Sequence, residues 1–188
     1  MINKKLTFEK IVKNFGKLNQ KQVEGIDALI SEYQNQGLTD LRFVAYILAT
    51  AWWETANTMQ PIAEFGKGKG RDYGKRLRMN RKLYTNTQNI FYGRGFTQNT
   101  WIDNYEKLTK CNTKGWDFVN NPDLLLELEP SIWATFYAMQ TGLYTGKKLS
   151  NYFNKTTNDP VNARRIINGS DKAEKIADYY HKFLNSIS

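Results

Sequence analysis

Apolar residues recur with the spacing of helices along most of the chain. The clearest segment is LRFVAYILATAWWE, from Leu41 to Glu54. At 100° per residue, one stripe of this helix carries Phe43, Ile47, Ala51 and Glu54. The segment therefore predicts a central, buried helix whose buried stripe ends in a carboxyl group. Because Pro61 disfavours helical backbone in the residue before it, we expect the chain to leave the helix between residues 57 and 60.

Similar patterns predict the other elements. Helices or helical turns are expected over residues 8–15, 20–36, 97–110, 130–141, 149–153 and 160–167, and from Ser170 onward. The best strand candidate is 84–96, where Ile90, Phe91 and Tyr92 precede a Gly-Arg-Gly turn. The fold class is therefore mainly α, with a small β element. We expect one catalytic domain over 1–188, with N-terminal helices over 1–37.

Two carboxylates near the end of the central helix suggest acid–base chemistry. A buried Glu54 should have a raised pKa and retain its proton near neutral pH, as a general acid must. Glu64 falls in the loop after the helix, where it is free to be ionised. A glycosidase uses one protonated and one ionised carboxyl group. The alternative is that Glu54 is only a paired or half-exposed helix residue.

The composition excludes several other kinds of chemistry. The chain of 188 residues has one cysteine, Cys111, and one histidine, His181. We therefore expect no internal disulfide, no zinc site of the His/Cys type, no metal and no cofactor. His181 lies in the C-terminal helical pattern and is interpreted as a surface residue rather than a catalytic one. The sequence contains no apolar run of transmembrane length and no secretory signal at residues 1–16.

The positive charge is concentrated in one segment. The net charge is +9, and residues 66–82, GKGKGRDYGKRLRMNRK, contain eight basic residues and one acid. The four glycines of this segment favour a loop or a short irregular hairpin over a helix. Three interpretations are open: a nucleic-acid patch, a solvated loop, or the basic rim of a groove for an anionic substrate.

Several motifs together resemble glycoside hydrolase family 19, which contains chitinases and peptidoglycan-degrading lysins. The main one is YGRGFTQNTW from Tyr92 to Trp101, followed by Asn104-Tyr105. WETA at 53–56 resembles the end of the family's catalytic helix, and MQPIAEFGKGKGRDYG at 59–74 resembles a loop of its lysin branch. ARRIING at 163–169 resembles its closing segment. The motifs occur in family order from about Leu38 to the C-terminal region.

The resemblance implies a lysozyme-like fold and an inverting glycosidase. It implies Glu54 as general acid and a second carboxylate as general base, for which Glu64 is the candidate and Asp72 the alternative. An inverting enzyme holds these groups about 6.5–9.5 Å apart, so that a water fits between them. The resemblance also implies residues that bind sugar or position this water: Thr97, Gln98, Thr100, Asn104 and Asn168.

Three residues near these motifs allow more than one interpretation. Tyr92 and Trp101 are candidates for stacking on sugar rings, and core packing is the alternative for Trp101. Arg94 is interpreted as a structural anchor of its turn rather than a substrate contact. Trp53 stands where the family commonly has histidine; this apolar neighbour should raise the pKa of Glu54 further and sets the chain apart from chitinases proper.

The basic segment favours peptidoglycan as the substrate, because chitin is neutral and peptidoglycan carries carboxylates. We expect a monomer that binds peptidoglycan or another N-acetylglucosamine-containing polymer, without nucleic acid and without membrane insertion. It would be made in the cytoplasm and released by a holin or a secretion machine. The alternatives are a chitinase of the same fold, a non-catalytic wall-binding module and a nucleic-acid-binding protein.

Overall fold

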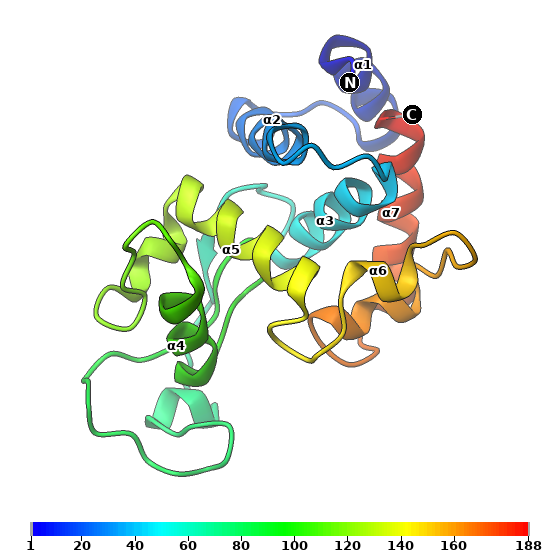
Figure 1. The fold of residues 1–188 in the computed structure, drawn as a ribbon. Coiled ribbons are helices and arrows are strands. Elements are labelled where there is room, and N and C mark those ends of the chain that lie inside the picture. The colour runs from blue at the N-terminus through cyan, green and yellow to red at the C-terminus, as the bar shows by residue number, and fades with distance from the viewer. Residues whose placement is uncertain (1, 188) are drawn as a thin grey trace. The chain divides into compact units, whose positions relative to one another are not determined.

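A computed structural model describes residues 2–187. In this part of the chain there are seven α-helices, three short 3-10 helices and a two-stranded sheet (Figure 1). The chain divides into two compact units: Met1–Gln60 with Phe136–Ser188, and Pro61–Thr135. The boundary after residue 135 falls within α5 (Leu128–Thr141). The interpretation of residues 1–188 as one catalytic domain stays a prediction.

The first unit is helical. Its elements are α1 (Lys4–Phe15), α2 (Gln20–Asn35), α3 (Leu41–Glu54), α6 (Leu149–Tyr152), η3 (Asn162–Ile166) and α7 (Ala173–Ile187), besides the last turns of α5. The predicted central helix is confirmed as α3, in which every residue from 44 to 52 is buried. Figure 1 shows α3 lying beside α7, from the other end of the chain. A helix that is apolar on all sides has to be covered in this way.

Aromatic side chains fill the space between these helices. Trp52 on α3 packs with Phe15 at 4.8 Å between ring centroids, and Phe15 packs with Phe183 on α7 at 4.4 Å. Nearer the N-terminus of α3, a second cluster joins Tyr46 to Phe153 at 5.3 Å. These tilted ring pairs bury a large apolar area between the helices. They hold α3 against α7 and so fix the position of its C-terminal end.

Helix α2 holds the turn that follows α3. Gln22 donates to the carbonyl of Asn57 at 2.9 Å, and Gly25 lies directly against Met59, which is fully buried. A Cβ added at Gly25 would lie 1.7 Å from the carbonyl oxygen of Met59. Glycine in mid-helix ordinarily lowers stability, so its presence here reflects this close approach of two backbones.

We therefore expect Gly25→Ala to destabilise the protein, although alanine is the better helix former. Overpacking of this kind costs about 1–3 kcal/mol, which lowers the melting temperature by about 2–4 °C per kcal/mol in a chain of this size. Thermal unfolding followed by circular dichroism measures the change. Gly169→Ala is the matched control, because its Cβ would meet nothing within 4 Å. An unchanged melting temperature for Gly25→Ala would contradict the packing described.

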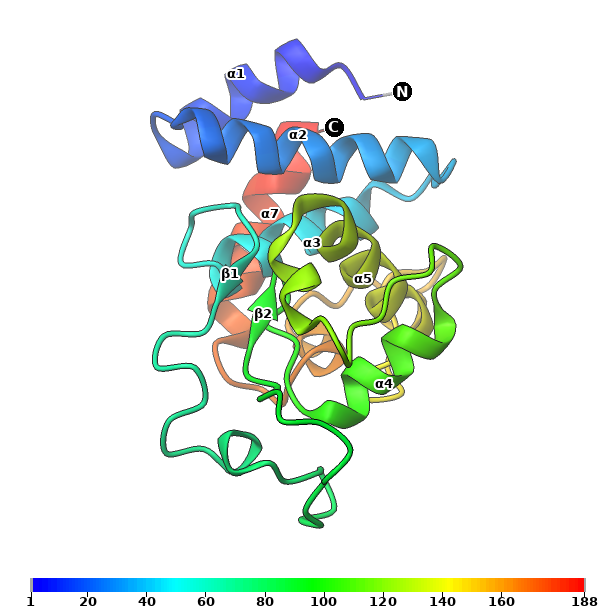
Figure 2. The same ribbon diagram turned by 90° about the vertical axis from the view of Figure 1, so that its left-hand side faces the viewer.

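The second unit contains the sheet and a smaller set of helices. Its elements are β1 (Ile62–Ala63), η1 (Asp72–Lys75), β2 (Arg94–Gly95), α4 (Ile102–Cys111), η2 (Pro122–Leu126) and the first turns of α5. Strands β1 and β2 are antiparallel, with Ile62 opposite Gly95 and Ala63 opposite Arg94 (Figure 2). The segment 66–82 consists of turns around the short η1, with an isolated bridge between Leu77 and Leu83, so it forms no α-helix, as the glycines predicted.

The strand predicted over 84–96 is wrong in extent, because only Arg94–Gly95 is a strand. Of the apolar residues before it, Phe91 and Tyr92 are buried and Ile90 is half-buried, but their carbonyls do not pair with another strand. The carbonyl of Ile90 accepts from the Arg94 guanidinium, and that of Phe91 accepts from the backbone of Trp101. A folded-back loop thus satisfies backbone groups that the pattern assigned to a sheet.

The helix predicted over 97–110 begins later, at Ile102. Arg94 and Asn99 exchange two backbone hydrogen bonds, which close a tight turn over the intervening residues. Gln98 and Trp101 both have positive φ, a conformation that a helix excludes. Within residues 2–187 no helix combines the length and the apolar character that a membrane span requires.

Candidate active site

Glu54 is the last residue of α3. The helix stops there, earlier than the region 57–60 that Pro61 suggested, because Thr55 closes its end. The Thr55 hydroxyl donates to the carbonyl of Ala51 at 2.7 Å and accepts from the backbone N–H of Met59 at 3.1 Å. Ala56 and Asn57 then adopt positive φ. This tight turn leaves the carboxyl group at the tip of a buried, rigid helix.

Arg164 is the partner of this carboxyl group. Nη1 of Arg164, on η3, lies 2.5 Å from Oε1 of Glu54, and the two side chains are only 4% and 14% exposed. Nε of Arg164 donates to the carbonyl of Asp171 at 3.0 Å, which fixes the guanidinium. Burial raises the pKa of Glu54, and Arg164 opposes this rise without cancelling it. The raised pKa predicted from the buried stripe is therefore found, but the arginine was missed.

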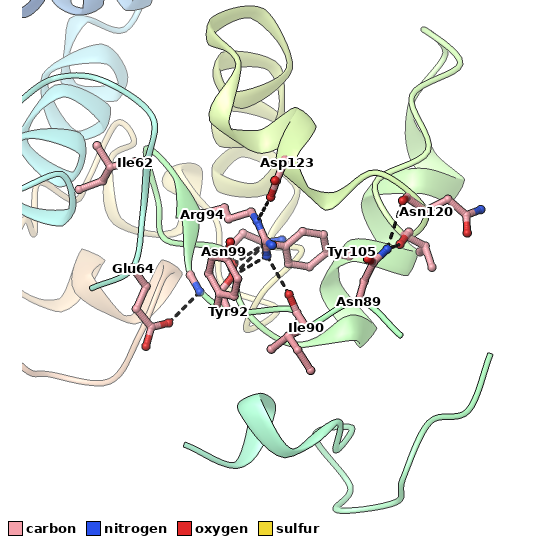
Figure 3. A network of polar contacts seen from close by, with 12 residues as sticks. Ile62, Glu64, Asn89, Ile90, Tyr92, Arg94, Asn99, Tyr105, Asn120 and Asp123 are labelled. Carbon is pink, nitrogen blue, oxygen red and sulfur yellow. Dashed lines mark hydrogen bonds and ion pairs between the residues drawn. The ribbon is translucent and has the colours of Figure 1, made fainter. Parts of the chain in front are cut away.

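Glu64 follows β1 in the second unit, and two donors hold its carboxylate. Oε2 accepts from the backbone N–H of Gly93 at 2.8 Å, a bond visible in Figure 3, and Oε1 accepts from the Tyr73 hydroxyl at 2.9 Å. Burial and this bond to Glu64 raise the pKa of Tyr73 to about 12, so its hydroxyl stays protonated. A Cβ at Gly93 would lie 3.2 Å from Oε2 of Glu64, which is why glycine suits this position.

Asp72, the alternative base, has a different environment. Its carboxylate pairs with Lys75 at 3.3 Å and with Arg81 through its other oxygen. Both partners come from the same basic segment as Asp72. The carboxylate therefore neutralises local charge within the loop, whereas Glu64 is oriented by two neutral donors.

Arg94 connects the residues of the YGRG turn (Figure 3). Its side chain is 4% exposed, with Nε 2.7 Å from Asp123 and Nη1 donating to the carbonyl of Ile90 at 3.0 Å. The guanidinium also lies 3.5 Å from the centre of the Tyr92 ring. Arg94 is thus an anchor of its turn, as interpreted from the sequence.

The aromatic candidates differ in accessibility. Tyr92 is 8% exposed and faces Arg94, so its predicted stacking on sugar stays a prediction. Trp101 is half-buried, and its ring meets that of Tyr73 edge-on at 5.5 Å. Trp101 is therefore linked through Tyr73 to Glu64. Sequence reasoning missed Tyr73, although its place nine residues after Glu64 in a turn-rich loop is consistent with a local contact.

Four of the predicted polar residues follow the YGRG turn in the second unit: Thr97, Gln98, Thr100 and Asn104. Gln98 donates to the carbonyls of Ile62 and Gly95, at 3.0 and 3.1 Å, so it ties the end of β2 to β1. Asn104 donates to the carbonyl of Thr100 at 3.0 Å. Thr97 is buried and Thr100 half-buried. The first contacts of these side chains are with the protein, and their roles toward sugar or water stay predictions.

Asn168 belongs to the first unit and lies next to Arg164. Its backbone N–H donates to the carbonyl of Arg164 at 3.0 Å. Its exposed side chain accepts from the N–H of Gly169 at 2.8 Å. The closing motif therefore supplies both the partner of Glu54 and an exposed amide a few residues later. Among residues 2–187, no group of three or more histidine, cysteine, aspartate or glutamate side chains gathers as metal ligands would.

These features place the chain in a structural class. Its fold is mainly α and lysozyme-like with a small two-stranded sheet, as expected, and it is the fold of family 19 glycoside hydrolases. In particular, the chain is similar to the crystal structure of a bacterial family 19 chitinase, with a TM-score of 0.65 and 19% sequence identity, over 96% of this chain and 93% of that one. A scan against protein-family models gave no match. A search of curated proteins gave none either.

Proposed function

We propose that this protein is a glycosidase that hydrolyses the β-1,4 bond between N-acetylated sugars of peptidoglycan, with inversion. The observation on which this depends is Glu54: a carboxyl group at the tip of a buried helix, with a pKa raised by burial and one arginine partner. A side chain so placed is able to hold a proton near neutral pH and to release it when charge develops nearby. The fold shared with a chitinase supports the same class of reaction.

In the proposed reaction Glu54 gives its proton to the glycosidic oxygen as the C1–O bond breaks. A water molecule attacks C1 from the opposite face and gives a proton to Glu64, so that the new hydroxyl has inverted configuration. Arg164 steadies the Glu54 carboxylate that remains. We favour Glu64 over Asp72 as the base, because the carboxylate of Asp72 already has two cationic partners.

Charge is the reason to prefer peptidoglycan to chitin. The chain carries +9, and eight basic residues lie within 66–82. A neutral polymer gains nothing from this charge, whereas lactyl-peptide carboxylates are attracted by it.

We further propose that the protein acts as a monomer, and that it reaches the wall from the cytoplasm through a holin or a secretion machine. A chitinase is the second candidate, and the named activity of the similar structure favours it.

The products of digestion test this proposal. We expect the protein to release soluble fragments with new reducing ends from purified peptidoglycan. Mass spectrometry after borohydride reduction identifies the sugar at the new reducing end. Proton NMR during the first minutes should show the α-anomer, because inversion of a β bond gives an α product. A β-anomer first would exclude inversion. Turnover of chitin oligomers without release from peptidoglycan would establish the chitinase, and no new reducing end from either polymer would overturn the glycosidase proposal.

A further inference from the structure

The loop that follows Glu64 exposes an unusual set of side chains. Phe65 has a relative exposure of 104%, the largest of any exposed apolar residue in residues 2–187. The next protruding residues are Lys67, Lys69 and Arg71, all exposed. A single exposed apolar side chain is ordinary by itself, and it is the three neighbouring cations that give this loop both an apolar face and positive charge. We call residues 65–71 the cationic aromatic loop.

The backbone of this loop is built from consecutive turns. The backbone N–H of Lys67 donates to the carbonyl of Glu64 at 3.1 Å. The backbone N–H groups of Lys69 and Arg71 donate in the same way to the carbonyls of Gly66 and Gly68, at 2.9 and 3.0 Å. The three glycines of the loop, Gly66, Gly68 and Gly70, all have positive φ, which a side chain would disfavour. Each turn therefore directs one larger side chain outward and places a glycine between it and the next.

The loop is also closed at its base. Gly68 is buried, and a Cβ at Gly74 would lie 2.0 Å from its carbonyl oxygen. At the start of the loop, Glu64 is held by Gly93 and Tyr73. The exposed side chains thus protrude from a base that is fixed at both ends.

Three other cations of the basic segment pair with carboxylates, which the sequence did not reveal. Arg78 pairs with Glu106 at 2.7 Å and with Asp103 at 3.4 Å. Lys75 and Arg81 pair with Asp72. Within residues 2–187, the cations of the loop itself pair with no carboxylate. Three of the cations without a carboxylate partner are therefore adjacent in the loop that follows Glu64, and the exposed Lys82, at the other end of the segment, is a further one.

We propose that the cationic aromatic loop binds the peptidoglycan strand, with Phe65 stacking on the apolar face of a sugar ring and Lys67, Lys69 and Arg71 contacting carboxylates of the stem peptides. This inference rests on the proposed function and deepens it. The repeat of peptidoglycan offers both elements, a pyranose ring and an acidic peptide attached to it. Because the loop begins at the residue after the proposed base, a strand bound there lies next to Glu64.

Binding of the inactive Glu54→Gln protein to insoluble polymers tests the loop apart from catalysis. Sedimentation with purified sacculi and with chitin beads compares Phe65→Ala and the triple variant Lys67→Gln/Lys69→Gln/Arg71→Gln. Phe65→Ala should weaken binding to both polymers by about 3–10-fold. The triple variant should weaken binding to sacculi by about 10-fold or more and leave chitin binding unchanged. Leu83→Ala, also exposed in this unit, and Lys5→Gln/Lys13→Gln/Lys17→Gln, three exposed lysines of the first unit, are the matched controls.

Three results would overturn the inference. The first is an equal loss of binding to sacculi in the control triple variant, which would mean that only the total charge of the protein matters. The second is unchanged binding to sacculi together with lost binding to phosphatidylglycerol vesicles, which would assign the loop to a membrane surface. The third is unchanged binding of every variant to every polymer. Cleavage assays distinguish these three results from failure of the proposed function. If the loop does not bind substrate but the protein is a glycosidase, the protein with Glu54 intact still releases reducing sugars.

Discussion

Replacing Glu54 by glutamine is expected to lower kcat on peptidoglycan by about 10²–10⁴-fold, the usual contribution of a general acid. Glutamine keeps the length of the side chain, and its amide oxygen still accepts from Arg164. It has no acidic proton to give to the leaving oxygen, so the interaction lost is one made in the transition state. KM should change little, because uniform binding of the substrate is not altered. Release of reducing sugars measures both constants.

The pH profile connects this loss to the environment of Glu54. A raised pKa means that the acid form persists to higher pH than in an ordinary glutamate. The activity of the unmodified enzyme should therefore fall as pH rises through this raised pKa, and the residual activity of Glu54→Gln should lack that alkaline limb. Circular dichroism and thermal unfolding provide the control, since the buried Arg164 loses its charged partner. A folded variant with unchanged activity would exclude Glu54 as the acid.

Replacing Glu64 by glutamine should lower kcat by a similar factor of about 10²–10⁴, because water then has no base to receive its proton. The substitution suits the site. The amide oxygen accepts from the N–H of Gly93 and the amide nitrogen donates to the Tyr73 hydroxyl, which rotates to accept. The turn should therefore keep its shape while the proton acceptor is removed. The same reducing-sugar assay measures the effect.

Asp72→Asn is the matched control for the Glu64→Gln variant. It removes a carboxylate from the same loop and frees Lys75 and Arg81, both at exposed positions. We expect its activity to stay close to that of the parent protein. If Asp72→Asn is inactive and Glu64→Gln retains activity, the assignment of the base is reversed. Loss in both variants with lowered melting temperatures would point to damage of the loop instead.

The sequence predicted the parts of the site that depend on local patterns. Helical spacing placed Glu54 near the end of the central helix, which α3 confirms, although the helix ends before the residues that Pro61 suggested. The glycines of 66–82 predicted turns. These features depend on backbone preferences and on burial along one element, which neighbouring residues decide.

The missed parts are contacts between distant segments. Arg164 lies 110 residues from Glu54, and no spacing rule relates them, although a buried carboxylate requires a partner. The strand expected over 84–96 failed for a similar reason. The apolar residues Phe91 and Tyr92 are buried, but the Arg94 side chain and the backbone of Trp101 take carbonyls that a strand would need. In the basic segment, the pairing of Arg78 depends on Glu106 and Asp103, which lie on α4.

The separation of Glu54 from Arg164 has a consequence for how the protein is made. While a ribosome is still translating the second half of the chain, α3 has emerged but η3 and α7 have not. Its apolar surface then lacks the helix that covers it, and Glu54 lacks its arginine. Contacts between such distant segments form only once both segments have been synthesised. A nascent chain therefore has the glutamate without its arginine, and this half of the site forms only after η3 and α7 have left the ribosome.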